Sequence, residues 1–289
     1  MTNTTLDTRT TLVIDVPTLR EALNSDRHVV LLDARHAPGE PSKRPEYEAG
    51  HLPGAYWVEL SQDLSGAKAP GTGNNPLPQP EALQQTLRDF GIHHDSLVVV
   101  YGSGPGAAPA RTWFTLRWAG VPEVRWLDGG LEAWVAAGGE LSTEEPAPGN
   151  GSIEVDGGNL PTLTTEEAAE LARTGVLLDA RGAKQYEGGP AEEGKPAQGH
   201  IPGAISAPAG SVLDASGRLK PADELREYFA GLGVSPGVPV GVYCGGGVAA
   251  TQLALALASI DVTAQVYVGS WSAWSADPTR PIATGNQPG

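Results

Sequence analysis

The sequence predicts an α/β fold made of two similar domains, each a mainly parallel sheet flanked by helices on both faces. The chain has 289 residues, which suits two domains at roughly 100–200 residues each. Four short motifs occur twice, in the same order, once in each half of the chain. Continuous apolar strands alternate with helical segments, a pattern typical of parallel sheets that are covered on both faces.

The repeat sets the domain organisation. The paired motifs are VVLLDAR (29–35) with VLLDAR (176–181), GHLPGA (50–55) with GHIPGA (199–204), LVVVYGSG (97–104) with VGVYCGGG (240–247), and LDGGLEAW (127–134) with YVGSWSAW (267–274). Matched positions are separated by 140 to 149 residues, which indicates two copies of one domain. We therefore predict a first domain over 12–140, a linker rich in proline, glycine and glutamate over 141–161, and a second domain over 162–285.

Each copy is expected to hold the same elements in the same order. A helix precedes an apolar strand that ends in Asp-Ala-Arg, and the His-x-Pro-Gly-Ala turn follows. A second helix, a buried strand, a glycine-rich turn, a third helix and a short strand complete the copy. The expected helices are 16–24, 80–90 and 108–119 in the first copy and 165–173, 221–232 and 249–259 in the second. The later strands are 97–101 and 124–127, matched by 238–243 and 264–268. Thr164 or Thr165 before Glu167 offers capping chemistry for the helix at 165.

Composition excludes several classes of function. The net charge is −15, which argues against a nucleic-acid binder and against binding to an anionic membrane surface. No apolar run approaches the ~18–20 residues of a membrane helix, and the polar N-terminus lacks the apolar run of a signal peptide. We therefore expect a cytoplasmic protein, with a secreted form carrying a separate leader as the alternative.

The chain has a single cysteine, Cys244. One cysteine excludes an intramolecular disulfide, a multi-thiolate metal site and a thioredoxin-type dithiol. It lies directly after an expected strand, on the side of a parallel sheet where ligands bind. The residues that follow it, Gly245, Gly246, Gly247, Val248 and Ala249, lead into a helix. Successive amides of such a loop form an anion nest, and the helix N-terminus adds about half a positive charge.

These features favour the thiolate, which is the nucleophilic form of cysteine. The same loop would hold a persulfide, whose terminal sulfur carries negative charge. A buried structural thiol is the alternative, but such a thiol needs no glycine triplet. The first copy has Gly102 in place of Cys244, so one half is expected to be catalytic and the other structural. A cysteine phosphatase would need an arginine six residues after the cysteine, where this chain has Ala250.

With these motifs in place, the chain resembles the tandem-domain rhodanese-type sulfurtransferases, the family of thiosulfate and 3-mercaptopyruvate sulfurtransferases. The resemblance covers roughly residues 12–284. It implies two rhodanese-like α/β domains with the catalytic loop in the second. It also implies that Cys244 takes a sulfane sulfur from a small-molecule donor and passes it to cyanide or a thiol. No metal and no organic cofactor are implied.

The sequence departs from the family at the positions that select the donor. The family's mercaptopyruvate pattern is Cys-Gly-Ser-Gly-Val-Thr, whereas here Gly246 lacks the serine hydroxyl and Ala249 replaces the threonine. Thiosulfate enzymes carry cationic residues just after the cysteine, and this loop has none. A substrate-binding arginine of the family corresponds to Gln185, which cannot supply a bidentate charge. Lys184 or Lys195 is the possible substitute, with solvated loop lysines as the alternative.

Departures also occur in the first domain, where Asn75 stands at the family's histidine position and Gly66 near its aspartate position. Other residues carry structural expectations. Because Arg35 and Arg181 occur in both copies, we expect each to pair with the neighbouring aspartate, and we expect His51 and His200 to form turns. Trp274 is expected in the core, and Trp271 is a candidate for lining the pocket. Arg111 could face the cleft between the domains, but an exposed helix position is expected.

Two functional hypotheses follow. The first is a sulfurtransferase that works through a Cys244 persulfide. The second is a weakly active persulfide carrier that delivers sulfur to a partner protein, which Gln185, Asn75 and Gly246 motivate. A purely structural cysteine would instead be unreactive towards iodoacetamide.

Overall fold

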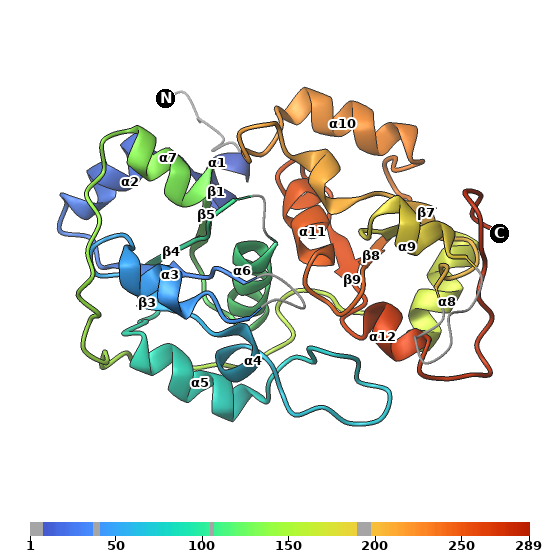
Figure 1. Cartoon of the computed structure of the whole chain (residues 1–289), viewed down its shortest axis with the longest axis horizontal. Helices are drawn as coiled ribbons and strands as arrows, with labels where there is room; N and C mark the ends of the chain where they lie inside the picture. The colour runs from blue at the N-terminus through green and yellow to red at the C-terminus, as the bar shows by residue number, and fades with distance from the viewer. Residues whose placement is uncertain (1–7, 37–40, 105–106, 190–197) are drawn as a thin grey trace.

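The structure is a computed structural model that describes residues 8–36, 41–104, 107–189 and 198–289. Two α/β units lie side by side, each built on its own sheet (Figure 1). The first sheet has the strand order β1-β5-β4-β2-β3, and the second has the order β7-β6-β8-β9. Every pairing between these strands is parallel, which confirms the predicted fold class.

The first unit follows the expected order, with additional short elements. Its strands are β1 (Val13–Ile14), β2 (Val29–Asp33), β3 (Tyr56–Trp57), β4 (Leu97–Tyr101) and β5 (Val124–Leu127). Its helices are α1 (Thr8–Leu12), α2 (Val16–Leu23), α3 (Arg44–Ala49), α4 (Leu60–Asp63), α5 (Pro80–Asp89), α6 (Ala108–Trp118) and α7 (Gly130–Ala136). The sequence patterns did not predict α1 or β1, although β1 forms the edge of the sheet beside β5.

The second unit repeats this arrangement. Its strands are β6 (Val176–Asp179), β7 (Ile205–Ser206), β8 (Val240–Tyr243) and β9 (Ala264–Val266). Its helices are α8 (Thr165–Thr174), α9 (Ala183–Glu187), the 3-10 helix η1 (Ala209–Val212), α10 (Ala222–Gly231), α11 (Ala250–Ala258) and α12 (Ser270–Trp274). A single parallel bridge between Thr162 and Val266 takes the place that β1 has in the first unit.

Side-chain oxygens fix the starts of the equivalent helices α2 and α8. The Thr164 hydroxyl accepts the Glu167 amide, and the Glu167 carboxylate accepts the Thr164 amide, a reciprocal capping box at the start of α8. In the first unit, Asp15 accepts the amide of Thr18 at 2.8 Å at the start of α2. Both caps satisfy amides that the first helical turn leaves without a partner.

Alternate residues of the central strands enter different cores. Val98 and Val100 of β4 join a core that also contains Val240 and Val242 of β8. The intervening Val99 joins a core confined to the first unit, and Tyr243 joins one confined to the second. Because successive strand residues point to opposite faces, each sheet has one face towards its own outer core and one towards a core shared by both units.

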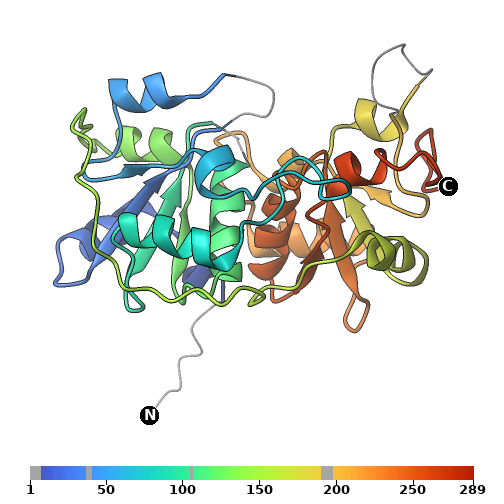
Figure 2. The same ribbon diagram turned by 90° about the horizontal axis from the view of Figure 1, so that it is seen from below.

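Helices α6 and α11 lie next to each other in this shared core (Figures 1 and 2). Every residue of α6 from Ala108 to Leu116 is buried, because one side of the helix covers β4 and β5 and the other meets the second unit. The expectation that Arg111 is an exposed helix residue is therefore wrong. Its side chain is 0% exposed and lies at the junction of the two units.

The segment predicted as a linker is packed along the first unit (Figure 2). The amides of Gly149 and Gly151 donate to the carbonyl oxygens of Asp89 and Arg88, at 2.6 and 2.9 Å. Ile153 is 1% exposed and belongs to the shared core. Among the helices of the described ranges, none has the length and apolar character that crossing a bilayer requires.

Candidate active site

Cys244 follows β8 directly, and its side chain is 2% exposed. The next residue, Gly245, is exposed, so the chain reaches the surface immediately beside the thiol. Helix α11 begins at Ala250, after the loop formed by 245–249. The loop and the thiol therefore lie beyond the carboxyl end of a central parallel strand, where open α/β sheets bind ligands.

The loop presents a row of amide donors. Within the described structure, none of the five N–H groups from Gly245 to Ala249 donates a hydrogen bond to another protein group. Unsatisfied amides next to a sulfur atom are costly unless water or a bound anion accepts them. The loop is therefore suited to stabilising negative charge on or beside Cys244.

The carbonyl oxygens of the loop are all anchored. The amides of Trp271 and Ser272, in α12, donate to the carbonyl oxygens of Cys244 and Gly245, both at 2.9 Å. The oxygens of Gly246 and Gly247 accept from two side chains of the first unit, Asn75 Nδ2 at 2.7 Å and Arg111 Nη1 at 2.8 Å. Four successive peptide groups are thus held in place from both units.

Glycine is required at one position of this loop in particular. Gly247 has φ +79°, and a Cβ there would stand 2.5 Å from the carbonyl oxygen of Val268. A side chain at this position would meet both backbone strain and a backbone atom that cannot move aside. The last glycine of the triplet noted in the sequence therefore has a steric cause.

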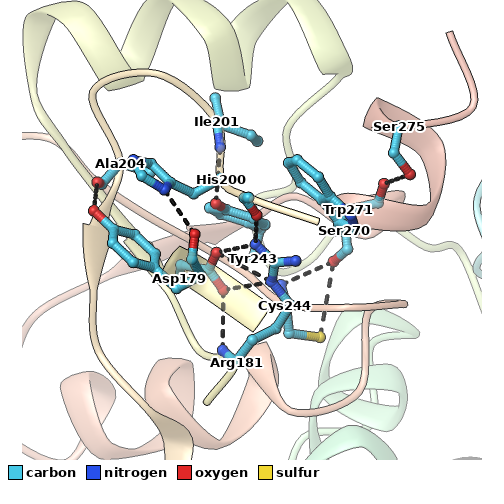
Figure 3. Close-up of polar contacts among 12 residues, drawn as sticks. Asp179, Arg181, His200, Ile201, Ala204, Tyr243, Cys244, Ser270, Trp271 and Ser275 are labelled. Atoms are coloured by element: carbon cyan, nitrogen blue, oxygen red, sulfur yellow. Dashed lines mark hydrogen bonds and ion pairs between the residues drawn. The ribbon is translucent and has the colours of Figure 1, made fainter. Parts of the chain in front are cut away.

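Ser270 binds the backbone of Cys244 (Figure 3). Its hydroxyl accepts the Cys244 amide at 3.1 Å, donates to the Tyr267 carbonyl oxygen at 2.9 Å, and lies 3.9 Å from Cys244 Sγ. Ser270 has φ +51°, a left-handed conformation that is unfavourable for residues other than glycine. The equivalent residue of the first repeat is Gly130, with φ +55°. The second repeat therefore keeps a hydroxyl beside Cys244 at the expense of backbone strain.

Each Asp-Ala-Arg motif forms the expected internal ion pair. Arg35 Nη2 lies 2.8 Å from Asp33 Oδ2, and Arg181 Nη2 lies 2.5 Å from Asp179 Oδ2. The pairs differ at Nη1: Arg35 Nη1 donates to the Glu46 carbonyl oxygen, whereas Arg181 Nη1 has no hydrogen-bond partner among the described residues. Burial opposes the charge on Arg181, but its contacts with Asp179 raise its pKa above the ordinary value.

Trp271 contacts both this ion pair and the cysteine. The Arg181 guanidinium is 4.5 Å from the centre of a Trp271 ring, and the Trp271 amide anchors the Cys244 carbonyl (Figure 3). Trp271 is 5% exposed and belongs to the outer core of the second unit, so its side chain is buried rather than spread along an open wall. Trp274 is buried in the outer core of the second unit, as expected.

The two histidines of the repeated turns have structural contacts. His51 and His200 are fully buried, and each stacks on a tyrosine at 3.9 and 3.8 Å between ring centres. Their Nδ1 atoms contact the carbonyl oxygens of Tyr47 and Tyr186, both at 2.8 Å. Because both repeats share these contacts, the two histidines stabilise the turns of the fold, and they do not account for a reaction at the cysteine, which only the second repeat has.

Among the described residues, the side chains of Lys184 and Gln185 form no hydrogen bond with Cys244 or its loop. Lys184 and Gln185 are exposed on the short helix α9. Lys195 lies outside the described residues. The described part of the chain has no cluster of three or more His, Cys, Asp or Glu side chains that could hold a metal ion.

In the first repeat, a carboxylate binds the start of the corresponding loop. Glu132 Oε1 accepts the Ser103 hydroxyl at 2.7 Å and the Gly104 amide at 2.9 Å. The matching position in the second repeat is Ser272, which is uncharged. The internal comparison therefore pairs an anion-occupied loop that lacks a cysteine with an open loop that contains one.

Comparisons with known proteins agree with this architecture. The rhodanese-like domain family matches residues 15–137 and 164–277. The chain belongs to the rhodanese-like family. It is 40% identical over 285 residues to a putative thiosulfate sulfurtransferase, SseB, of Mycobacterium tuberculosis, covering 97% of this chain and 99% of the relative. It is also 40% identical to a probable 3-mercaptopyruvate sulfurtransferase of Pseudomonas aeruginosa, covering 91% and 94% of the two chains.

A solved rhodanese-family structure extends the agreement to three dimensions. The crystal structure of SseA from Escherichia coli, described as a 3-mercaptopyruvate sulfotransferase, superposes with a TM-score of 0.80 at 32% identity. It covers 91% of this chain and 99% of its own. The family and the enzyme class predicted from the sequence are confirmed: this rhodanese is a sulfurtransferase.

Proposed function

We propose that this rhodanese transfers a sulfane sulfur through a persulfide on Cys244, with thiosulfate or 3-mercaptopyruvate as donor and cyanide or a thiol as acceptor. The observation that carries the proposal is the row of five amides at 245–249 that have no partner among the described residues, next to the only cysteine of the chain. Both donors occur in the names of relatives that align over nearly the whole chain.

The first half-reaction forms a sulfur–sulfur bond. The Cys244 thiolate attacks the outer sulfur of thiosulfate, the sulfur–sulfur bond of the donor breaks, and sulfite leaves with its electron pair. With 3-mercaptopyruvate the carbon–sulfur bond breaks instead, and the thiol proton ends on the carbon of the pyruvate that leaves. Either route leaves an anionic terminal sulfur, which the loop amides are suited to stabilise.

The second half-reaction returns the enzyme to its starting state. Cyanide attacks the terminal sulfur, the persulfide bond breaks, and thiocyanate leaves together with the regenerated Cys244 thiolate. A thiol acceptor would leave as a persulfide in the same way. Because one product departs before the acceptor binds, the reaction follows ping-pong kinetics.

Steady-state kinetics with each donor and with cyanide test this proposal. We expect parallel double-reciprocal lines for wild type, and no turnover above background for Cys244→Ser. The ratio of kcat/KM values for the two donors then identifies the preferred one. Intersecting lines, or unchanged turnover in Cys244→Ser, would overturn the persulfide route. Stoichiometric loading without turnover would support the carrier hypothesis instead.

A further inference from the structure

Two side chains of the first unit reach into the cysteine loop of the second. Asn75 comes from the segment 64–79, which crosses from the first unit towards α12 (Figure 1). Its Nδ2 donates to the Gly246 carbonyl oxygen at 2.7 Å. Arg111, from α6, donates through Nη1 to the Gly247 carbonyl oxygen at 2.8 Å and through Nη2 to the Asn75 carbonyl oxygen at 3.0 Å. The two side chains form one connected clamp on the loop.

The clamp fixes the direction of amides as well as of carbonyls. In a trans peptide group, the C=O of one residue and the N–H of the next point in opposite directions. Holding the oxygens of Gly246 and Gly247 against the first unit therefore turns the N–H groups of Gly247 and Val248 away from it. Those are two of the five amides that have no partner within the described structure.

We propose that Arg111 and Asn75 are positioning residues that hold the Gly247 and Val248 amides ready for negative charge on Cys244. This inference rests on the proposed function for its purpose, since a persulfide is the anion the amides would meet. It gives the domain without a cysteine a specific part in the reaction. Neither side chain is the reacting group; each acts through the loop backbone.

The environment of Arg111 supports the assignment. Burying a guanidinium is expensive unless an opposite charge compensates it. Burial lowers the pKa of Arg111 to about 10, and among the described residues the influence that opposes this shift comes from Cys244. The hydrogen bonds of Arg111 go to two carbonyl oxygens, and its Nε has no partner. A negative charge on the cysteine would therefore meet a buried guanidinium that has no carboxylate partner among the described residues.

The other ionisable groups near the carboxyl ends of these strands do not supply an unpaired positive charge as Arg111 does. Arg181 is paired with Asp179 and stacks on Trp271. Burial raises the pKa values of Tyr243 and Tyr267, which keeps both phenols neutral. Arg111 is thus the cation of this region that has no carboxylate partner among the described residues.

The glycines of the loop fit the clamp sterically. A Cβ on Gly246 would stand 3.0 Å from Asn74 Cβ and 3.2 Å from Asn75 Nδ2. A Cβ on Gly247 would stand 3.2 Å from Arg111 Nη1. All three distances are tighter than ordinary van der Waals contact. The absence of side chains at 246 and 247 therefore lets the first unit approach the loop backbone.

Alkylation of Cys244 by iodoacetamide over a pH series tests the clamp without any sulfur donor. Asn75→Ala removes the contact to Gly246, and Asn74→Ala is the matched control because its side chain makes no hydrogen bond in the described structure. Arg111→Lys keeps a charge but loses the two-pronged geometry, and Arg111→Met loses both. Thermal unfolding of each variant reports on the fold.

We expect Asn75→Ala to slow alkylation at neutral pH by about tenfold and to move the midpoint of its rate profile to higher pH. This is less than the roughly hundredfold effect of deleting a direct anion donor, because the clamp acts through the backbone. Asn74→Ala should match wild type, and Arg111→Lys should retain more reactivity than Arg111→Met.

A rate profile for Asn75→Ala identical to that of wild type would overturn the proposal, even if the Arg111 variants fail to fold. Equal profiles in all variants together with lower melting temperatures would assign these residues a purely structural role. Sulfur loading of wild type, measured in parallel, tests the proposed function separately, since alkylation depends on the thiolate and not on a donor.

Discussion

The Ser270 hydroxyl accepts the backbone amide of Cys244 at 3.1 Å and lies 3.9 Å from its sulfur. A strained serine conformation holds it there, whereas the first repeat uses a glycine at the same place. The comparison of two repeats in one chain separates what the fold needs from what the cysteine needs.

Ser270→Ala and Ser270→Gly should separate strain from hydrogen bonding. Ser270→Ala keeps the unfavourable φ and leaves a buried amide without its acceptor, so we expect a loss of about 1–3 kcal/mol in unfolding free energy. Ser270→Gly loses the same acceptor but relieves strain of order 1 kcal/mol, so it should be the more stable variant. Both should alkylate more slowly than wild type. Urea unfolding and iodoacetamide rates measure the two effects, and greater stability of Ser270→Ala would contradict the strain argument.

Moving the cysteine to the first repeat should not create a second site. A Cβ on Gly102 would stand 2.7 Å from Pro109 Cγ, and Glu132 already accepts hydrogen bonds from Ser103 and Gly104 of that loop. We expect Gly102→Cys, in a Cys244→Ser background, to gain no sulfur from either donor. The overpacking should cost about 1–3 kcal/mol in unfolding free energy. Intact-mass measurement checks the first expectation. A persulfide on the cysteine at position 102 would contradict it and show that the loop of the first repeat can also hold sulfur.

Removing the carboxylate of the Asp-Ala-Arg motif should have different effects in the two repeats. Asp179→Asn and Asp33→Asn each disrupt a buried ion pair, so each should lose about 3–5 kcal/mol of unfolding free energy. Only Asp179→Asn should also slow Cys244 alkylation, because Arg181 packs on Trp271 and the Trp271 amide anchors the cysteine carbonyl. Equal alkylation rates in the two variants would show that the ion pair of Asp179 and Arg181 does not influence the reactivity of Cys244.

The cap at Asp15 gives a pH-dependent stability. Hydrogen bonds from Thr18 hold the pKa of Asp15 below its ordinary value of 3.8, so the folded state favours the carboxylate. The stabilisation is present above that value and is lost as pH falls through the lower folded-state value. We expect Asp15→Ala to lose about 1 kcal/mol of unfolding free energy at neutral pH, with the difference from wild type shrinking in acid. The exposed Asp26→Ala is the control, and a difference that grows in acid would reverse the assigned sign.

Much of the fold follows from local patterns that the structure retains. The repeats place β4 and β8 at matching positions, and strand 97–101 was expected with the bounds it has. Elements of two residues, such as β1 and β7, carry too few side chains to show a period, so only tertiary pairing reveals them. Ile153 looked like part of a linker because its neighbours are glycine and acidic residues, yet it fills a gap in the shared core.

The site was predictable where one residue type carries the signal. The position of Cys244 after a strand and before three glycines was readable directly. Arg111 was not, because a single arginine in a helix reads as a surface residue unless the partner surface is known. The signal was its setting: Thr112, Trp113 and Phe114 follow it, which leaves this stretch of the helix little polar surface. Asn75 is separated from Gly246 by 171 residues, and no local pattern joins them.

Intact-mass analysis after brief incubation with thiosulfate or 3-mercaptopyruvate tests the central claim most directly. The account predicts that wild type gains the mass of one sulfur atom with at least one donor, that cyanide removes it, and that Cys244→Ser gains none. A wild-type protein that gains no sulfur from either donor, or a Cys244→Ser variant that gains as much as wild type, would contradict it.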